Sequence, residues 1–179
     1  MTTPTSPATT DPADLAGVFD RYARELLRYC TRRVGEQVAE DVVAETFLVA
    51  YEQRHRYDAA RGEVLPWLYG IATNLLRRHR RTEIRALRAL AHADGGSPVD
   101  GPAQRATERV DAARAVARLS AVLAKLPRRQ RDVLMLYAVA ELEYAEIAAA
   151  LQIPLGSVQS ALHRARAKVR AALAEGDAR

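Results

Sequence analysis

The chain has 179 residues, which is enough for one medium domain or two small ones. Its 27 Lys and Arg exceed its 22 Asp and Glu, giving a formal net charge of +5 at pH 7. A basic chain often binds a polyanion, although a basic surface without a partner explains the charge equally well. The single cysteine excludes an intramolecular disulfide, and the sequence contains neither a signal-peptide pattern nor a membrane-length apolar run, so we expect a soluble, cytoplasmic protein.

The composition favours helices throughout. Much of the 49% hydrophobic fraction is alanine, the best helix former, and only 6% of the residues are aromatic. We therefore expect an all-α fold. Nearly all the positive charge is arginine, whose planar fork suits phosphate, but a GC-rich genome would also enrich alanine and arginine.

The first half of the chain predicts three helices after a Thr- and Pro-rich segment, residues 1–13, that we expect to be disordered. Apolar side chains at three- and four-residue steps predict a helix over residues 14–34, with an inner face of Phe19, Tyr22, Ala23, Leu26, Leu27 and Cys30. A second helix, over residues 37–54, has an inner face of Val42, Val43, Thr46, Phe47 and Ala50. Its other side is acidic and carries Glu40, Asp41, Glu45 and Glu52.

Residues 54–62 (RHRYDAARG) are polar and basic and predict a loop. Its basic side chains, tyrosine and glycine are what a single-stranded DNA site needs, although a charged surface loop is the commoner explanation. A third helix follows, with Pro66 in its first turn and an inner face of Leu65, Leu68, Ala72, Leu75 and Leu76. We expect this helix to continue through a basic stretch as far as Arg88.

Residues 92–102 (HADGGSPVDGP) are the best candidate for a flexible linker, because Gly and Pro cluster there without any periodicity. We place the outer limits of this linker at residues 89 and 107. It separates a first domain, residues 14–88, from a second, residues 108–175.

The second half predicts four helices. The first ends before Pro127 and is expected to bury Val116, Leu119, Leu123 and Leu126. The next starts at Pro127 and buries Val133, Leu134 and Tyr137. A short helix over residues 144–151, a turn at residues 152–154 and a longer basic helix over residues 155–174 have the layout of a helix-turn-helix. The last helix has an apolar seam of Val158, Ala161, Leu162, Ala165, Val169 and Leu173.

The outward face of this last helix suits DNA, because Ser and Gln can bond base edges and Arg can bind guanine or phosphate. An ordinary solvated face is the alternative, which the matching apolar seam on both sides of the turn makes less attractive. The sequence shows no catalytic set: the four histidines are dispersed, and there is no HExxH pair, cysteine cluster or phosphate loop. We expect no enzyme activity, no cofactor and no metal.

Four ordered blocks carry a resemblance to a known family: AEDVVAETFLVAY (39–51), PWLYGIATNLLRRHRR (66–81), LPRRQRDVLMLY (126–137) and YAEIAAALQIPLGSVQSALHRARAKVRAAL (144–173). Together they resemble the extracytoplasmic-function (ECF) sigma factors, the smallest members of the sigma-70 family. The resemblance implies two helical domains, sigma region 2 and sigma region 4, and a role in promoter-specific initiation by RNA polymerase.

The resemblance also implies a role for individual residues. Core RNA polymerase would be bound, through its clamp, by Asp41, Glu45, Thr46, Phe47 and Leu48. The −10 element would be read and opened by Tyr57, Asp58, Arg61, Gly62, Asn74, Arg77, Arg78 and Arg81. The −35 element would be read by Ser157, Gln159, Ser160, His163, Arg164 and Arg166. The implied partners are core polymerase (clamp and flap regions), promoter DNA and an anti-sigma factor, with no membrane.

Three departures from the family pattern stand out. Ala44 replaces a frequent Gln, so one clamp contact is expected to be missing. Gln159 and Ala161 stand where family members often carry positive charge, which should weaken phosphate affinity. Glu141 and Glu143 stand where Gly and a Ser or Thr cap are common, so the following helix should be slightly less stable.

Two other functions remain open from the sequence. A helix-turn-helix regulator that is not a polymerase subunit would need a sensor or dimer face in the first domain. A helical adaptor without a DNA role would show no salt-dependent binding to nucleic acid.

Overall fold

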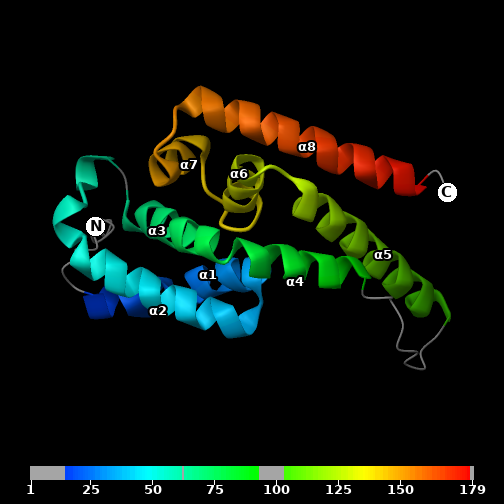
Figure 1. Cartoon of the computed structure of the whole chain (residues 1–179), viewed down its shortest axis with the longest axis horizontal. Helices are drawn as coiled ribbons and strands as arrows, with labels where there is room; N and C mark the ends of the chain where they lie inside the picture. The colour runs from blue at the N-terminus through cyan, green and yellow to red at the C-terminus, as the bar shows by residue number, and fades with distance from the viewer. Residues whose placement is uncertain (1–14, 62, 93–102, 178–179) are drawn as a thin grey trace, which may run out of the picture.

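Helices form the whole of the regular structure that Figure 1 shows for the described part of the chain, residues 15–61, 63–92 and 103–177 of a computed structural model. The first half contains α1 (Leu15–Val34), α2 (Glu36–Glu52), the 3-10 turns η1 (Arg54–Arg56) and η2 (Ala59–Arg61), α3 (Val64–Arg78) and α4 (Arg80–His92). The second half contains α5 (Ala103–Lys125), α6 (Arg128–Ala138), α7 (Tyr144–Leu151) and α8 (Leu155–Asp177). The predicted all-α fold is confirmed.

The core of the first half lies where α1, α2 and α3 meet. Leu26 and Cys30 of α1 are fully buried, and all five residues predicted for the inner face of α2 are buried. Phe19 is an exception: it is 46% exposed and leans on the ring of Phe47, with 4.9 Å between ring centroids. Gly35 separates α1 from α2 at φ +83°, a backbone conformation that glycine adopts without strain.

Two expectations about the first half are corrected. The segment 54–62 is not wholly irregular, because two 3-10 turns occupy most of it. The third helix is not continuous through the basic stretch. It ends at Arg78, where His79 closes the last turn with its backbone N–H on the carbonyl of Leu76, and α4 starts at Arg80. Because of this break, α4 does not continue along the axis of α3.

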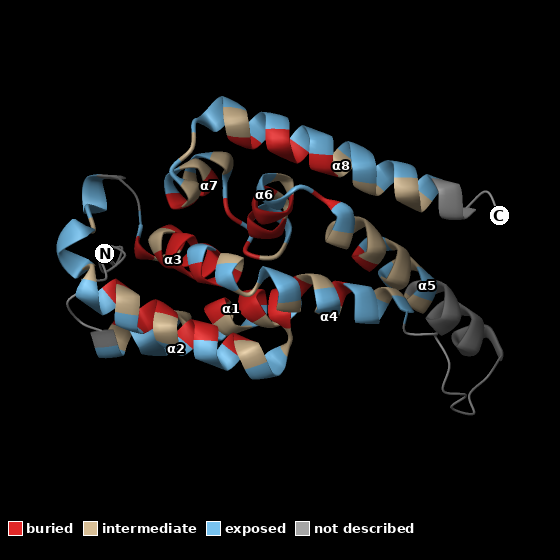
Figure 2. Ribbon diagram, viewed as in Figure 1, coloured by how far each residue is buried: buried red, intermediate tan, exposed pale blue. Residues whose placement is uncertain are grey.

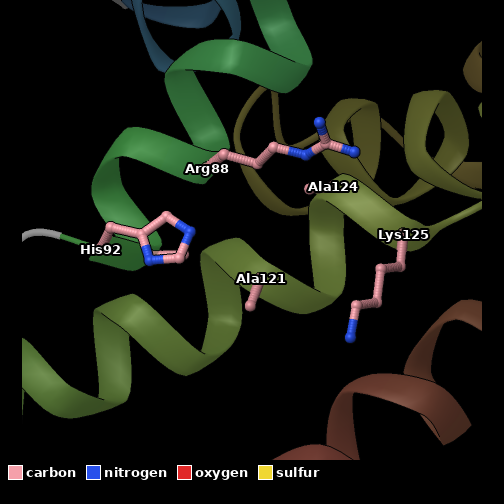
Figure 3. Close-up of a pocket in the computed structure, with 6 residues that line it drawn as sticks. Arg88, His92, Ala121, Ala124 and Lys125 are labelled. Atoms are coloured by element: carbon pink, nitrogen blue, oxygen red, sulfur yellow. The ribbon is translucent and has the colours of Figure 1, made fainter.

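The helix α5 follows the predicted burial only in part. Leu123 packs against the core and Leu126, directly after the helix, is buried as predicted, but the earlier apolar residues are not. Val116 and Leu119 are 52% and 37% exposed, whereas Ser120 is buried. Small side chains at Ala121 and Ala124 face α4 instead, and small side chains let two helices lie close together (Figure 3). The prediction failed at Val116 and Leu119 because it assigned every large apolar residue to the interior. A basic pocket of about 300 Å³ remains between these helices, lined by Arg88, Ala91, His92, Ala121, Ala124 and Lys125.

The two halves pack against each other rather than standing apart (Figures 1 and 2). The helix α3 lies on α7, and α4 lies beside α5. One continuous hydrophobic core contains Leu68 and Leu76 from the first half and Leu136 and Ile147 from the second. The helices α4 and α5 also run into the two ends of the predicted linker, and residues 93–102 lie outside the described part of the chain.

None of the described helices combines the length and the apolar character that a bilayer crossing requires.

Candidate nucleic-acid interface

The surface predicted to read the −35 element is one face of α8. Val158, Ala161, Leu162 and Ala165 are between 0% and 1% exposed and hold the helix against the rest of the domain. These positions recur at three- and four-residue steps, so the intervening positions point outward. The exposed side chains on this outward face are Gln159, Ser160, His163 and Arg164. Ser157, in the first turn of the helix, is half-buried.

The helix-turn-helix geometry is set by local backbone features. The N-terminus of α7 forms a capping box, in which the backbone N–H of Glu143 donates to Glu146 Oε2 at 2.6 Å. Glu146 therefore compensates for the poorer cap at Glu143, and the expected loss of stability in this helix is offset. Gln152 ends α7 in the left-handed conformation (φ 54°, ψ 47°), and Pro154 leads into α8. This turn sets the direction in which α8 leaves α7.

Arg166 lies at the edge of this surface between two tyrosines. Its guanidinium carbon is 4.4 Å from the ring centroid of Tyr137, and Nη1 is 3.4 Å from the hydroxyl of Tyr144. The two rings lie 5.7 Å apart. Burial lowers the pKa of Arg166, but the hydroxyls of Tyr144 and Tyr137 raise it by more. The pKa of Arg166 is therefore above its ordinary value. Tyr137 was predicted to lie in the core, but it is 36% exposed because it covers this arginine.

One predicted departure from the family pattern does not lie on the outward face of α8. Ala161 is fully buried, so a charged side chain at that position would start from the interior side of α8. Gln159 is exposed. Of the two departures, only the one at Gln159 therefore removes a positive charge from the outward face of α8.

The residues predicted for the −10 element occupy the η1–η2 segment and the end of α3. Tyr57 is half-buried, with its ring 5.2 Å from that of Trp67, and burial raises its pKa. Asp58 Oδ1 accepts the backbone N–H of Ala60 at 2.9 Å and so caps η2. Gly62 and the side chain of Arg61 lie outside the described part of the structure. Tyr57 is thus partly a packing residue.

The polar residues at the end of α3 are tied to neighbours. Arg77 donates through Nη1 to Asn74 Oδ1 at 2.6 Å, and its Nε lies 3.3 Å from Asp132 Oδ2. Arg78 pairs with Glu45 at 2.9 Å. Asn74, Arg78 and Arg81 are exposed, whereas Arg77 is half-buried. The structure therefore brings these four residues to one end of α3 and the start of α4.

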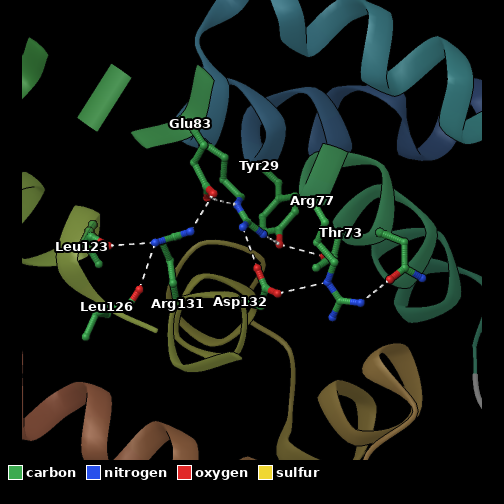
Figure 4. A network of polar contacts seen from close by, with 10 residues as sticks. Tyr29, Thr73, Arg77, Glu83, Leu123, Leu126, Arg131 and Asp132 are labelled. Carbon is green, nitrogen blue, oxygen red and sulfur yellow. Dashed lines mark hydrogen bonds and ion pairs between the residues drawn. The ribbon is translucent and has the colours of Figure 1, made fainter. Parts of the chain in front are cut away.

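A buried polar network that sequence reasoning missed joins the two halves behind this surface (Figure 4). Arg33 contacts Glu83 at 2.7 Å, Asp132 at 2.6 Å and the hydroxyl of Tyr29 at 2.8 Å. That hydroxyl is 2.9 Å from Thr73 Oγ1. Burial raises the pKa of Tyr29 to about 12, partly offset by the adjacent Arg33 charge.

Arg131 completes this network. Its Nη1 donates to the carbonyls of Leu123 and Leu126 at 3.3 and 3.1 Å, at the end of α5, and its Nη2 lies 3.1 Å from Glu83 Oε2. The latter contact is an ion pair without hydrogen-bond geometry. The nearby charges hold the pKa of Arg33 well above its ordinary value despite burial, so the network stays ionised at that arginine. The helical spacing of Arg33 from Tyr29 and Cys30 could have indicated that Arg33 is buried, but it does not indicate the partners of Arg33 in the second half.

The predicted polymerase-binding set divides between surface and core. Asp41 is exposed, Glu45 is half-buried, and Leu48 is 57% exposed on the outer side of α2. Thr46 and Phe47 are buried, and the Thr46 hydroxyl donates to the carbonyl of Val42 at 2.7 Å. In this structure the side chains of Thr46 and Phe47 therefore pack inside the domain and help hold α2 in place.

Among the described residues, no group of three or more His, Cys, Asp or Glu side chains could hold a metal ion. Cys30 is fully buried, and burial raises the pKa of its thiol to about 12. A thiol in this setting is unreactive, as expected for a packing residue.

Comparisons with known proteins match both halves of the chain to one family. The family model "Sigma-70 region 2" matches residues 18–94, and "Sigma-70, region 4" matches residues 117–169. The chain is 30% identical over 175 residues to "ECF RNA polymerase sigma factor SigW" of Bacillus subtilis, covering 89% of both proteins. It is 35% identical over 147 residues to SigD of Mycobacterium tuberculosis, covering 78% of this chain and 68% of SigD.

Solved structures give the same picture of the fold. CnrH, in complex with the cytosolic domain of CnrY, matches with a TM-score of 0.61 at 25% identity, covering 90% of this chain and 88% of CnrH. A sigma factor RpoE in complex with the anti-sigma factor NepR from Bartonella quintana matches at 21% identity with the same TM-score, covering 90% of this chain and 97% of that one.

Proposed function

The chain belongs to the ECF RNA polymerase sigma factors of the sigma-70 family, and we propose a division of its work between the two halves. Like its relatives, it is a sigma factor that directs transcription initiation by RNA polymerase. The first half, residues 14–88, binds core polymerase and the −10 element. The second half, residues 108–175, reads the −35 element.

The outward face of α8 carries the proposed −35 reading, and this is the observation on which the proposal rests most. Exposed side chains at Gln159, Ser160, His163 and Arg164 can reach a major groove because the opposite face is packed in the domain. Arg164 is the best placed to bind a guanine edge or a phosphate. Arg166 sits farther along the helix, held by Tyr137, and suits a phosphate contact.

The proposed −10 surface is the η1–η2 segment with the end of α3. Asn74, Arg78 and Arg81 offer exposed polar and basic groups, and the half-buried ring of Tyr57 offers an edge for a base. Arg78 and Arg81 would contact the phosphate backbone of the single-stranded −10 DNA. The proposed polymerase contact is the outer side of α2, formed by Asp41, Glu45 and Leu48, where acidic and apolar side chains lie together.

The remaining assignments follow from this role. Sigma factors are initiation factors that supply binding rather than chemistry, and we propose that this chain has no catalytic activity and works in the cytoplasm with RNA polymerase. Since the RpoE structure it matches includes an anti-sigma factor, we propose that a separate anti-sigma protein restrains this chain too.

Reconstituted transcription tests the proposal. Purified core polymerase, with and without the full chain, is supplied with the DNA upstream of the chain's own gene, because many family members activate themselves. A defined transcript that requires the chain supports the proposal. DNA binding by the chain without any transcript, and without co-purification of core polymerase, would instead indicate a helix-turn-helix regulator.

A further inference from the structure

The pocket of about 300 Å³ between α4 and α5 lies outside the residue sets proposed for polymerase and promoter DNA (Figure 3). Three of the residues that line it are alanines, Ala91, Ala121 and Ala124, and all three are half-buried. Because a methyl group reaches only a short distance from the backbone, the space beside these positions stays open.

The other three lining residues are all basic, and they come from both helices. Arg88 and His92 lie one turn apart on α4, and Lys125 is the last residue of α5. All three side chains are exposed. No lining residue is acidic, and in the part of the chain that the structure describes no carboxylate pairs with any of the three. Positive charge therefore gathers at the pocket without a partner.

Two of these basic groups also have a simple structural role. His92 and Lys125 lie in the last turns of α4 and α5, where positive charge offsets the partial negative charge of the terminal carbonyls. Arg88 lies one turn before the end of α4, so this role does not account for it. The role also does not account for the hollow that the three side chains share. A hollow with polar groups converging from two helices is typical of a ligand site.

The chemistry of these side chains suits phosphate. A guanidinium can donate two parallel N–H groups to phosphate oxygens, and a lysine ammonium binds phosphate as a compact charge. A volume of about 300 Å³ holds roughly ten waters at about 30 Å³ each, whereas one phosphate group, with about five heavy atoms, fills only about half of it. Since the basic groups lie on two helices, a ligand with two or more linked phosphates can reach both.

We propose that this pocket binds a small polyphosphate, either inorganic or the phosphate chain of a nucleotide. Arg88 and His92 hold the phosphates from α4 and Lys125 holds them from α5, while the methyl groups of Ala121 and Ala124 leave room for the ligand between the helices. A DNA duplex is a poorer occupant, because its phosphates lie along a rigid, extended surface that cannot enter this space. The site gives the chain a small-molecule input that none of the proposed sigma activities requires.

Calorimetric titration of the full chain, without divalent cations, tests the proposal. The probes are pyrophosphate, ADP and orthophosphate. Pyrophosphate should bind one to one with a Kd below about 1 mM, and at least tenfold more tightly than orthophosphate, because its second phosphate reaches the other helix. ADP affinity equal to that of pyrophosphate identifies the phosphates alone as the recognised chemistry. ADP affinity at least tenfold higher identifies a nucleotide.

Charge variants test which residues bind the ligand. Arg88→Gln and Lys125→Gln should each weaken pyrophosphate binding by at least fivefold, since each removes a charge-assisted hydrogen bond. Arg85→Gln is the matched control, because Arg85 is an exposed arginine on the same helix but does not line the pocket. This control should bind pyrophosphate as wild type does.

A variant that fills the pocket separates a cavity from a basic surface. Ala121→Leu occupies the space between the helices without changing any charge and should abolish pyrophosphate binding. Its matched control is Ala171→Leu at an exposed position on α8. Circular dichroism checks folding, and if Ala121→Leu does not fold, the exposed Arg88, Lys125 and Arg85 variants decide the matter.

Three results would overturn the proposal. The first is no pyrophosphate binding to the wild-type chain. The second is an equal loss in the Arg85 variant, or full binding in a folded Ala121→Leu variant, either of which would indicate a diffuse basic surface. The third is displacement of pyrophosphate by a non-promoter duplex at equal phosphate concentration, which would indicate a DNA contact instead.

Discussion

The guanidinium of Arg166 on α8 stacks on the ring of Tyr137 on α6, with 4.4 Å between the guanidinium carbon and the ring centroid. The contact joins the proposed recognition helix to the helix that precedes the helix-turn-helix. Because the ring restricts the arginine, the charge is held at one place on the surface rather than moving freely. Tyr137 is therefore a positioning residue for a proposed phosphate contact.

Removing the ring should weaken upstream recognition. Cation–π contacts at exposed sites contribute about 0.5–1 kcal/mol, so Tyr137→Ala should reduce transcription from promoters that depend on a −35 element by about two- to fivefold. Tyr137→Phe keeps the ring and should retain nearly wild-type output. Equal losses in the Ala and Phe variants, measured by run-off transcription, would show that the ring face does not hold Arg166.

The helices could be predicted from the sequence because their apolar periodicity is strong. The inner face of α2 and the seam of α8 were both found in this way. The face of α5 was found only in part. Leu123 and Leu126 lie inward as predicted, but the structure buries Ser120 and leaves Val116 and Leu119 exposed. Small residues give a weak apolar signal even where they determine how closely two helices approach.

The site was predictable only in part. Exposed positions on α8 follow from its seam, so Gln159 and Arg164 were placed on the outward face by helical spacing alone. The contacts that cross between the halves were not predictable. Nothing local in the sequence pairs Arg33 with Asp132, which lie 99 positions apart along the chain. Such pairs depend on how the halves pack, which periodicity does not encode.

Reversing a charge on α2 should weaken polymerase binding. Asp41→Arg places a cation on the proposed docking face and should reduce affinity for core polymerase by at least tenfold, and adding Glu45→Arg should abolish co-purification. The matched control is Asp20→Arg, an equal charge change at an exposed position on α1. Wild-type affinity in the double variant, with helical content unchanged, would show that this face does not bind polymerase.

Stability should fall in alkaline solution because of Tyr29. Burial raises its pKa from 10.0 to about 12, so the unfolded chain loses this proton near pH 10 while the folded chain keeps it to about pH 12. The free energy of unfolding is thus unaffected by this group below pH 10 and decreases between pH 10 and 12, by up to about 1.4 kcal/mol per pH unit.

Tyr29→Phe separates this effect from other titrations. At pH 8 the variant should be less stable by about 1–3 kcal/mol, because Thr73 and Arg33 lose their partner. At pH 11 the difference from wild type should shrink, since the variant has no phenol to titrate. Chemical denaturation at both pH values measures it, and an equal difference at pH 8 and pH 11 would contradict the account.

Limited proteolysis tests the domain boundary. The Gly- and Pro-rich composition of residues 92–102 predicts that protease cuts there first. Because α3 packs on α7 and α4 on α5, the two fragments should remain associated on size exclusion after the cut and separate only in denaturant. First cleavage within α3 or α8, with residues 92–102 intact, would contradict the boundary.

The central claim is that α8 reads the −35 element, and Arg164→Ala tests it most directly. A base-directed arginine contributes about 1–3 kcal/mol of discrimination, so the variant should lose roughly tenfold in transcription if about 1.4 kcal/mol is removed. Run-off transcription is measured with core polymerase on matched templates, one with the upstream element and a duplex −10 region, the other with a preformed −10 bubble and no upstream element. The account predicts a tenfold loss on the first template and wild-type output on the second; an equal loss on both would show that α8 does not read the −35 element.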